Sequence, residues 1–190
     1  MERTYIEEKK FEKIDFTENV LGKDDYEQCL FSNCNFSNTD LSNIHFSECE
    51  FHGCNLSLAT LTKTALRDIK FINCKLLGLH FENCNAFLFS VNFDNCLMNL
   101  SSFYKLKLTK TKFKNSSLQE MDFTETDLTG SVFDNCDLAG TTFENTVLEK
   151  TDFRTSYNYS IDPAINRVKK AKFSIAGIIG LLDKYDIDIE

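Results

Sequence analysis

The chain has 190 residues, and its 29 acidic against 21 basic side chains give a net charge of −8. That length suits one domain with a sizeable core, and a hydrophobic content of 42% with 18 Phe excludes an intrinsically disordered chain. The longest apolar run, residues 174–182, is about half the ~20 residues that a membrane-spanning helix needs. The acidic balance argues against direct nucleic-acid binding, because DNA-binding proteins normally carry a basic surface.

The N-terminal stretch MERTYIEEKKFEKID is charged from its second residue and has no apolar signal-peptide core. We therefore expect a cytoplasmic protein. In the cytoplasm the eight cysteines would be reduced rather than paired in disulfides.

A five-residue period dominates the chain. Steps of five rotate by roughly 140° on an α-helix and alternate between the two faces of a strand, so neither structure gathers such side chains on one side. The period instead predicts a solenoid in which the chain turns once per five residues and each coil stacks on the previous one. Residues 31–56 show the repeat with Phe31, Phe36, Leu41, Phe46, Phe51 and Leu56.

Columns of residues 20 apart predict four five-residue sides per coil. One step, from residue 71 to residue 93, is 22 residues long and predicts a two-residue insertion near residues 82–92. Because the series stops at residue 153, we expect a repeat domain over residues 1–158 and a separate C-terminal segment over residues 159–190. One column is Phe throughout: Phe11, Phe31, Phe51, Phe71, Phe93, Phe113, Phe133 and Phe153.

This pattern resembles the pentapeptide-repeat family. In that family a central Leu or Phe and a small residue two positions earlier both point inward, which corresponds here to Phe36 and Cys34. The resemblance covers about residues 6–157. It implies an all-β fold, a right-handed quadrilateral β-helix.

All eight cysteines stand two residues before a position of the five-residue series, at the small inward site. No CxxC motif occurs, and thiols stacked on one wall cannot surround a metal tetrahedrally. We interpret the cysteines as small buried core residues. His45, His52 and His80 fall at outward positions without an evident third ligand, so we expect surface histidines and no metal.

The chain also lacks the sequence motifs of common enzymes, including G-x-S-x-G, the P-loop, G-x-G-x-x-G and H-E-x-x-H. A regular solenoid lacks the deep pocket that most enzymes use. We therefore expect neither enzymatic activity nor a cofactor.

Charge is segregated along the chain. Residues 11–50 carry nine acids and two bases, residues 51–116 carry three acids and nine bases, and residues 117–153 carry nine acids and one base. The net charges are −7, +6 and −8. A need for solubility explains outward charge in general but not this segregation.

The C-terminal segment follows other rules. Asp162 and Pro163 predict a helix start, a second short helix is expected over residues 174–184, and residues 185–190 alternate like a strand. Such a segment would form a helical cap on the open end of the solenoid. Its apolar surface exceeds what a cap needs, so we expect a homodimer interface formed by Phe173, Ile175, Ile178, Ile179, Leu181, Leu182 and Tyr185.

The run DPAINRVKKAKFS and the apolar helix after it are similar to the endings of quinolone-resistance (Qnr-type) pentapeptide proteins. The resemblance implies tail-to-tail dimers that imitate DNA and bind DNA gyrase or topoisomerase IV. The phosphate surrogates would then be Glu120, Asp122, Glu125, Asp127, Asp134, Asp137, Glu144 and Glu149.

Two features depart from that subgroup. The basic middle segment interrupts the acidic surface, and the long projecting loops of many resistance proteins are missing, so we do not expect strong drug protection even with binding. The alternative is a protein–protein interaction scaffold with an unrelated partner, in which the basic stretch 105–114 would matter as much as the acids.

Overall fold

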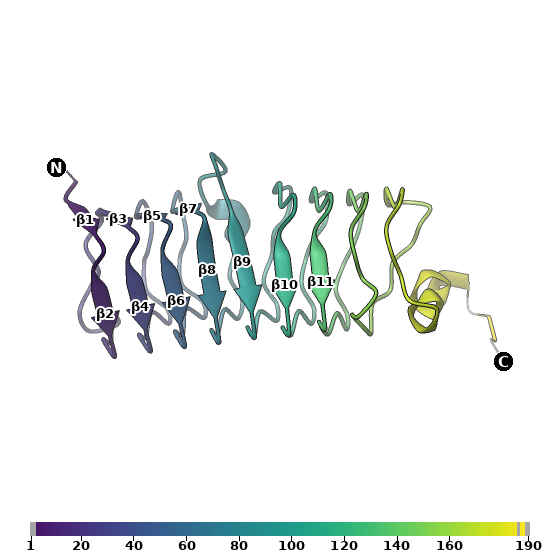
Figure 1. Cartoon of the computed structure of the whole chain (residues 1–190), viewed down its shortest axis with the longest axis horizontal. Coiled ribbons are helices and arrows are strands. Elements are labelled where there is room, and N and C mark those ends of the chain that lie inside the picture. The colour runs from purple at the N-terminus through teal and green to yellow at the C-terminus, as the bar shows by residue number, and fades with distance from the viewer. Residues whose placement is uncertain (1–2, 186, 189–190) are drawn as a thin grey trace.

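The computed structural model describes residues 3–185 and 187–188. The chain forms a parallel β-solenoid whose coils stack along one axis, with the two ends of the chain at opposite ends of the stack (Figure 1). This confirms the predicted quadrilateral β-helix. Each coil contributes one short extended segment to each of four walls, because bridged residues lie 20 positions apart over most of the chain.

Two walls contain the regular strands, which are three or four residues long. The first wall is a four-stranded sheet of β1 (Tyr5–Glu7), β3 (Asp25–Glu27), β5 (His45–Ser47) and β7 (Ala65–Arg67). The second wall is a seven-stranded sheet of β2 (Lys10–Glu12), β4 (Leu30–Ser32), β6 (Glu50–His52), β8 (Ile69–Ile72), β9 (Val91–Asp94), β10 (Lys112–Lys114) and β11 (Val132–Asp134).

The third and fourth walls consist of isolated parallel bridges, such as Asn35↔Asn55 on the third and Ser102↔Asp122 on the fourth. A 3₁₀ turn, η1 (Phe81–Asn83), lies on the fourth wall. Every wall therefore runs parallel to the solenoid axis, although only two walls have enough consecutive pairs to count as sheets.

The corner after the second wall shows how the sequence turns the chain. From Phe11 to Phe133, the residue two positions after the central Phe of this wall adopts a left-handed backbone, for which Asn is the best-suited residue after Gly. Asn73, Asn95, Asn115 and Asn135 occupy this corner with φ between 50° and 55°. Their amides also form a ladder: Asn95 Nδ2 donates to Asn73 Oδ1 at 2.7 Å, and Asn135 Nδ2 donates to Asn115 Oδ1 at 3.0 Å.

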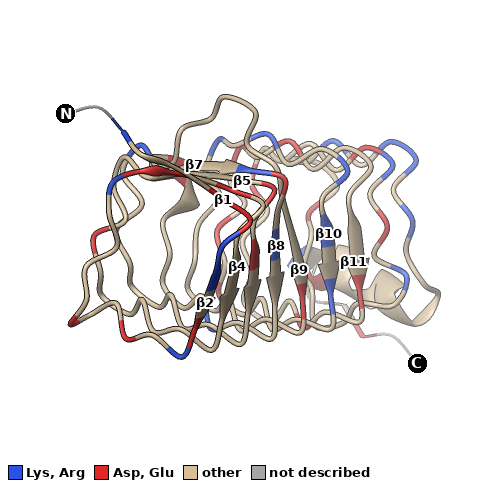
Figure 2. Cartoon of the chain, turned by 60° about the vertical axis from the view of Figure 1, so that its left-hand side comes forward, with Lys and Arg blue, Asp and Glu red and all other residues tan. Residues whose placement is uncertain are grey.

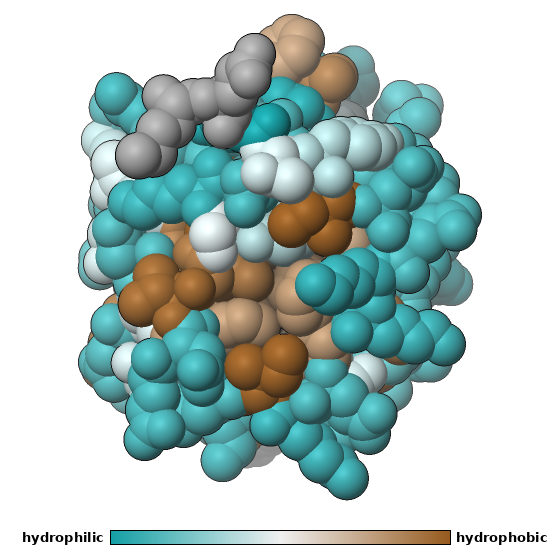
Figure 3. All heavy atoms as spheres, turned by 90° about the vertical axis from the view of Figure 1, so that its left-hand side faces the viewer, coloured by the Kyte–Doolittle hydropathy of each residue, from teal (hydrophilic) through white to brown (hydrophobic). Residues whose placement is uncertain are grey.

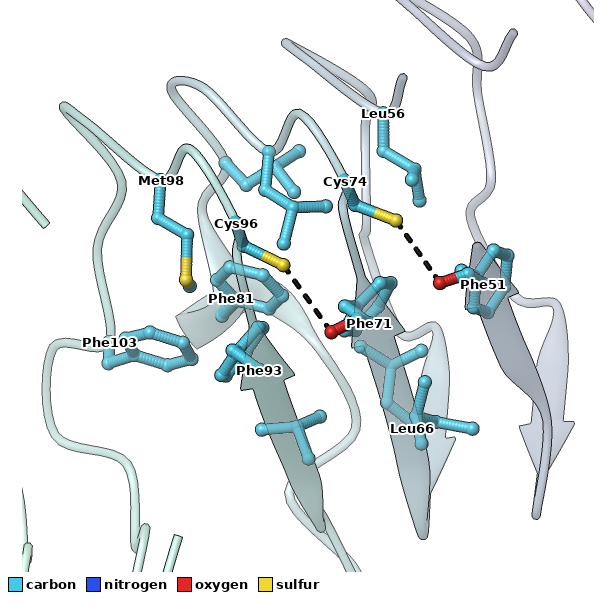
Figure 4. Packing of buried hydrophobic residues seen from close by; sticks show 14 of the residues in the cluster. Phe51, Leu56, Leu66, Phe71, Cys74, Phe81, Phe93, Cys96, Met98 and Phe103 are labelled. Carbon is cyan, nitrogen blue, oxygen red and sulfur yellow. Dashed lines mark hydrogen bonds between the residues drawn. The ribbon is translucent and has the colours of Figure 1, made fainter. Parts of the chain in front are cut away.

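The core is built around the predicted column of phenyl rings. Consecutive rings in the column stack with centroids 4.7 to 5.5 Å apart and planes within 22° of parallel. A second column on the fourth wall, from Phe81 to Phe143, meets it edge to face, for example at Phe103 and Phe113 with an interplanar angle of 75°. Figure 4 shows this arrangement around Phe71, with the rings filling the inside of the coil.

The cysteines are buried core residues with free thiols, as the sequence indicates. Most of these thiols lie within hydrogen-bond distance of a carbonyl of the preceding coil: Cys74 Sγ is 3.2 Å from the Phe51 carbonyl oxygen, and Cys96 Sγ is 3.4 Å from that of Phe71 (Figure 4). Burial raises the pKa of Cys49 and of Cys136 to about 12. Thiols with such a pKa are not thiolates at neutral pH and are unreactive.

The register changes at one place. Ala65 bridges Asn85, 20 residues on, whereas Ile69 bridges Val91, 22 residues on. The two extra residues therefore lie between Asn85 and Val91. They form a loop that rises above the coil just before β9 (Figure 1), and Phe87 at this loop is 66% exposed.

The C-terminal segment differs from the sequence-based expectation, because no helix begins at Asp162. The Asp162 carboxylate accepts the Ala164 N–H at 2.8 Å and so closes an Asx turn, and Asn166 then fills the small inward position. There Asn166 Oδ1 accepts the Thr146 N–H at 2.8 Å, as the inward Ser116 and Ser156 hydroxyl oxygens accept the N–H of Cys96 and Cys136 in other coils. The solenoid therefore continues where a helix was expected.

The five-residue series also extends further than expected. Parallel bridges continue to Asp152↔Lys172, beyond the boundary expected at residue 158. Phe173 stacks on Phe153 at 5.4 Å and adds a ninth ring to the column. The last coil is not recognisable in the sequence pattern, because the five-residue series would need Phe or Leu at residues 158 and 163. Position 163 is Pro163, and the aromatic residue Tyr159 stands one position beyond residue 158.

The second short helix expected over residues 174–184 is present, in the form of two 3₁₀ turns that make up the cap. They are η2 (Ala176–Leu181) and η3 (Asp183–Tyr185). Gly177 and Gly180 face Tyr159 so closely that a Cβ on either residue would overlap it, so both glycines are needed for this contact. The strand-like tail expected over residues 185–190 falls partly outside the described residues, and Ile187 and Asp188, which are described, are not in a strand.

The opposite end of the solenoid exposes apolar side chains at the centre of a polar rim (Figure 3). Val20 of the first coil is 81% exposed, although Leu21 and Phe16 beside it are buried. None of the described helices is both long enough and apolar enough to cross a membrane.

Candidate interaction surfaces

The eight acids singled out from the sequence lie on all four walls near the C-terminal end. The solenoid separates them because neighbours in sequence fall on successive walls. The third wall and its corner hold Asp137 and Glu120, and the second wall holds Asp134. The first wall holds Asp127 and Glu149, and the fourth wall and its corner hold Asp122, Glu125 and Glu144.

Several of these acids have partners within the chain. Glu149 Oε1 accepts from Arg167 at 2.6 Å, and Glu125 lies 3.5 Å from the Lys105 ammonium. Asp127 accepts both the N–H and the hydroxyl of Thr129. All of these contacts fix the carboxylates, and the two ion pairs also reduce the negative charge presented to a partner.

Four further acids form no ion pair with the described residues. Asp122 accepts the Thr124 N–H at 2.8 Å, and Asp134 accepts the Thr155 hydroxyl at 2.9 Å. Both carboxylates keep their full charge, because a neutral donor does not cancel it. Glu144 is exposed and has no side-chain partner among the described residues, and the same holds for Glu120.

Asp137 is held more firmly than the others. Partial burial works to raise its pKa, but hydrogen bonds from Gln119 Nε2 at 2.6 Å, Asn158 Nδ2 at 2.8 Å and the Ala139 N–H hold the pKa below its ordinary value. Asp137 is therefore ionised well below neutral pH, and its carboxylate has a fixed position.

The basic stretch 105–114 also spreads over several walls. Lys105 and Lys114 pair with Glu125 and Asp94, each at 3.5 Å. Lys107, Lys110 and Lys112 are exposed and form no ion pair with any residue that the structure describes. Strand β10 is blue in Figure 2 because both of its outward residues are lysines.

The residues expected at a dimer interface divide into two groups. Phe173 and Leu181 are partly buried and pack on the solenoid core, so they belong to the cap. Ile175 is 91% exposed, which is unusual for so large an apolar side chain. The other residues with large exposed area are Ile178, Ile179 and Tyr185, and Leu182 is half-buried.

The histidines each have a carboxylate neighbour. His45 Nδ1 is 2.9 Å from Asp25, and His52 Nε2 is 2.9 Å from Glu50. The described residues bring together no group of three or more His, Cys, Asp or Glu side chains that could hold a metal ion.

One feature was not foreseen as a site from the sequence. A groove of about 630 Å³ surrounds the base of the raised loop, with Arg67 and Phe89 in its lining beside residues 107–111. The signal was present as the 22-residue step from residue 71 to residue 93. That step predicts an insertion but does not predict a groove at the base of the inserted loop.

A family model described as a pentapeptide repeat region matches residues 24–86 and 78–153, which is more than half of the chain. The chain belongs to the pentapeptide-repeat family. The sequence has no match among the curated proteins.

Among solved structures, this pentapeptide-repeat chain is similar to a trypsin-treated variant of QnrB1, a plasmid-mediated fluoroquinolone resistance protein. The identity is 16%, the coverage is 100% of both chains and the TM-score is 0.63. It is also similar to HetL of the cyanobacterium Nostoc sp., which is involved in heterocyst differentiation regulation, at 16% identity with a TM-score of 0.53. That match covers 90% of this chain and 86% of HetL. At such low identity these likenesses show the fold alone.

Proposed function

We propose that this chain is a non-enzymatic, cytoplasmic binding protein whose C-terminal third imitates DNA and engages a type II topoisomerase, DNA gyrase or topoisomerase IV. Inhibition of the enzyme and some protection from quinolones would be the consequences. The choice of a topoisomerase as the partner comes from the resemblance of the C-terminal segment to the quinolone-resistance subgroup. The physical support for the proposal comes from the distribution of negative charge around the solenoid.

The density of that charge is the observation that carries the proposal. Residues 117–153 have a net charge of −8 and occupy just under two coils, a rise of about 9 Å at ~4.8 Å per coil. B-form DNA carries one negative charge per ~1.7 Å, or about five over the same length. Even with Glu125, Glu149 and Asp152 paired to bases outside the segment, this part of the solenoid matches the charge density of DNA.

The arrangement of the acids fits this role as well. DNA presents phosphates around its whole circumference, and here the carboxylates lie on all four walls rather than on one face. Glu120 and Glu144 are the most available to a partner, since both are exposed and unpaired in the described part of the chain. A surface that binds phosphates would attract these carboxylates over a distance of about one Debye length.

A tail-to-tail homodimer would double this surface. The exposed Ile175, Ile178 and Ile179 lie at the end of the solenoid next to the acidic coils, so their pairing in two subunits would bring both acidic segments beside the two-fold axis. Ile179→Asp should therefore convert a dimer into a monomer in light scattering. A wild type that is already monomeric would remove the dimer from the proposal.

The test is a gyrase supercoiling assay with the purified protein, with and without a fluoroquinolone. We expect inhibition at micromolar protein, and loss of inhibition in the double variant Glu120→Lys/Glu144→Lys. The matched control is Glu8→Lys/Glu18→Lys, which changes the net charge equally at the far end of the rod. Inhibition by neither wild type nor control, or equal inhibition by all three proteins, would contradict the proposal.

The second candidate is a scaffold that binds an unrelated partner. The unpaired lysines of the middle segment favour it, because they interrupt the acidic surface that DNA mimicry requires. Absence of any effect on the topoisomerase would leave this candidate.

A further inference from the structure

The first wall is interrupted where the raised loop leaves it. Bridges connect Ala65 to Asn85 on one side of the loop and Lys107 to Asp127 on the other, and none connects residues 86–90 to Lys107 among the described residues. The other three walls stay continuous through the same coils, for example from Leu97 to Ser117 and from Ser102 to Asp122 on the third and fourth walls. At this level of the solenoid the first wall therefore contains an internal strand edge.

Backbone groups at this edge have no partner. In a regular coil the residue before each central position donates its N–H to the preceding coil and accepts from it, as Asp127 does with Leu106 and Leu108. Lys107 stands one coil earlier on the same wall. Its N–H and C=O, and the C=O of Thr109, form no hydrogen bond with the described residues. Such a row of free donors and acceptors is what an added strand pairs with.

The two sides of the groove differ in charge. On the side of the coils that precede the loop, three acids line the groove and each accepts a hydrogen bond from an uncharged donor: Glu27 from the Tyr5 hydroxyl, Glu48 from Gln28 Nε2 and Asp68 from the Ser90 hydroxyl. On the side of the free edge, Lys107 and Lys110 line the groove, and both are exposed and form no ion pair within the described residues. The basic charge of the groove is therefore concentrated along its free edge.

Arg67 adds to this charge from the other side of the groove. It packs over the ring of Phe87 at 5.7 Å, and its buried Nε has no partner. The groove therefore offers a free strand edge that carries two lysines, with the Arg67 guanidinium on the opposite side.

We propose that an acidic, extended segment of a partner protein binds in this groove as an added strand along residues 107–110. Its backbone would pair with Lys107 and Thr109, and its acidic side chains would face Lys107 and Lys110. A peptide fits better than a nucleic acid because the free C=O groups need donors, which a phosphate backbone does not supply. This surface uses none of the acids of the proposed function, so the two proposals fail independently.

The experiment measures binding of a fluorescent hexapeptide of alternating Glu and Val to the full-length protein by anisotropy. We expect binding that Lys107→Glu/Lys110→Glu weakens by about tenfold or more. The control is Lys150→Glu/Lys170→Glu. These two lysines stand, like Lys110, at the corner after the first wall, but in coils whose backbone hydrogen bonds to each other are complete. The control should bind the peptide like the wild type.

Two further probes test strand pairing itself. The same peptide with alternate amides N-methylated should bind about tenfold more weakly, and the plain peptide should slow hydrogen exchange of the Lys107 N–H by at least that factor. Equal binding of both peptides would overturn the proposal. So would an unchanged Kd in the Lys107→Glu/Lys110→Glu variant, or binding of oligothymidylate in place of the peptide.

Discussion

Truncation of one ring in the middle of the phenyl column tests the core directly. Phe113 is fully buried and stacks between Phe93 at 5.2 Å and Phe133 at 4.7 Å. It also meets Phe103 and Phe123 edge to face, so four rings would border the cavity left by Phe113→Ala. Because the ladder above and below holds the walls in place, the cavity cannot collapse, and we expect a loss of about 3–5 kcal/mol in the free energy of unfolding.

Urea denaturation followed by circular dichroism measures this loss, and two variants serve as controls. Phe11→Ala removes the ring at the open end, which stacks on Phe31 alone within the column, so we expect only the transfer part of the cost, about 1.5–3 kcal/mol. Lys112→Ala, next to Phe113 but exposed, should change stability by less than about 0.5 kcal/mol. A loss below about 1 kcal/mol for Phe113→Ala would refute the continuous column.

Three further predictions concern the cap, one carboxylate and the thiols. Gly180→Ala would drive its Cβ into the Tyr159 carbonyl oxygen and should cost about 1–3 kcal/mol by urea denaturation, whereas Ala176→Ser on the exposed side of the same turn should be neutral. Hydrogen bonds from Ser42 and the Lys23 ammonium lower the pKa of Asp40 from 3.8 to about 2. The ionised carboxylate therefore stabilises the fold above pH 3.8, and this stabilisation is lost as the pH falls through 2. Carboxyl titration by NMR should show the lowered pKa of Asp40, and Lys23→Met should raise this pKa. Iodoacetamide at pH 8 should leave the cysteines unmodified in the folded protein and alkylate all eight after unfolding, and rapid reaction in the folded state would contradict their burial.

The periodic part of this fold could be predicted from the sequence because one rule repeats in every coil. An inward Phe such as Phe51 and an inward small residue two positions earlier, such as Cys49, mark each side, and the 20-residue spacing of equivalent positions identifies four sides per coil. The last coil was not predicted, because Asn166 replaces the small inward residue and keeps its hydrogen bond with a different side chain. Asp162 and Pro163 also suit a tight turn as well as a helix start.

The distribution of charge was predicted along the chain but not around the axis. Glu120 and Asp122 are close in sequence yet lie at different places around the coil, because the chain passes from one wall to the next every five residues. The free strand edge at Lys107 exists because the raised loop leaves backbone groups of that residue without a partner among the described residues. Neither the composition nor the periodicity of the sequence shows which backbone groups remain unpaired. Only the position of the loop was visible beforehand, in the 22-residue step.

Competition with DNA tests the central claim of DNA mimicry most directly. A fluorescent duplex bound to gyrase, followed by anisotropy, should be displaced by the wild-type protein and by Glu8→Lys/Glu18→Lys. The Glu120→Lys/Glu144→Lys variant should need about tenfold more protein for the same displacement. If the protein bound gyrase while the duplex stayed fully bound, or if both variants displaced it equally, the acidic coils would not be acting in place of DNA.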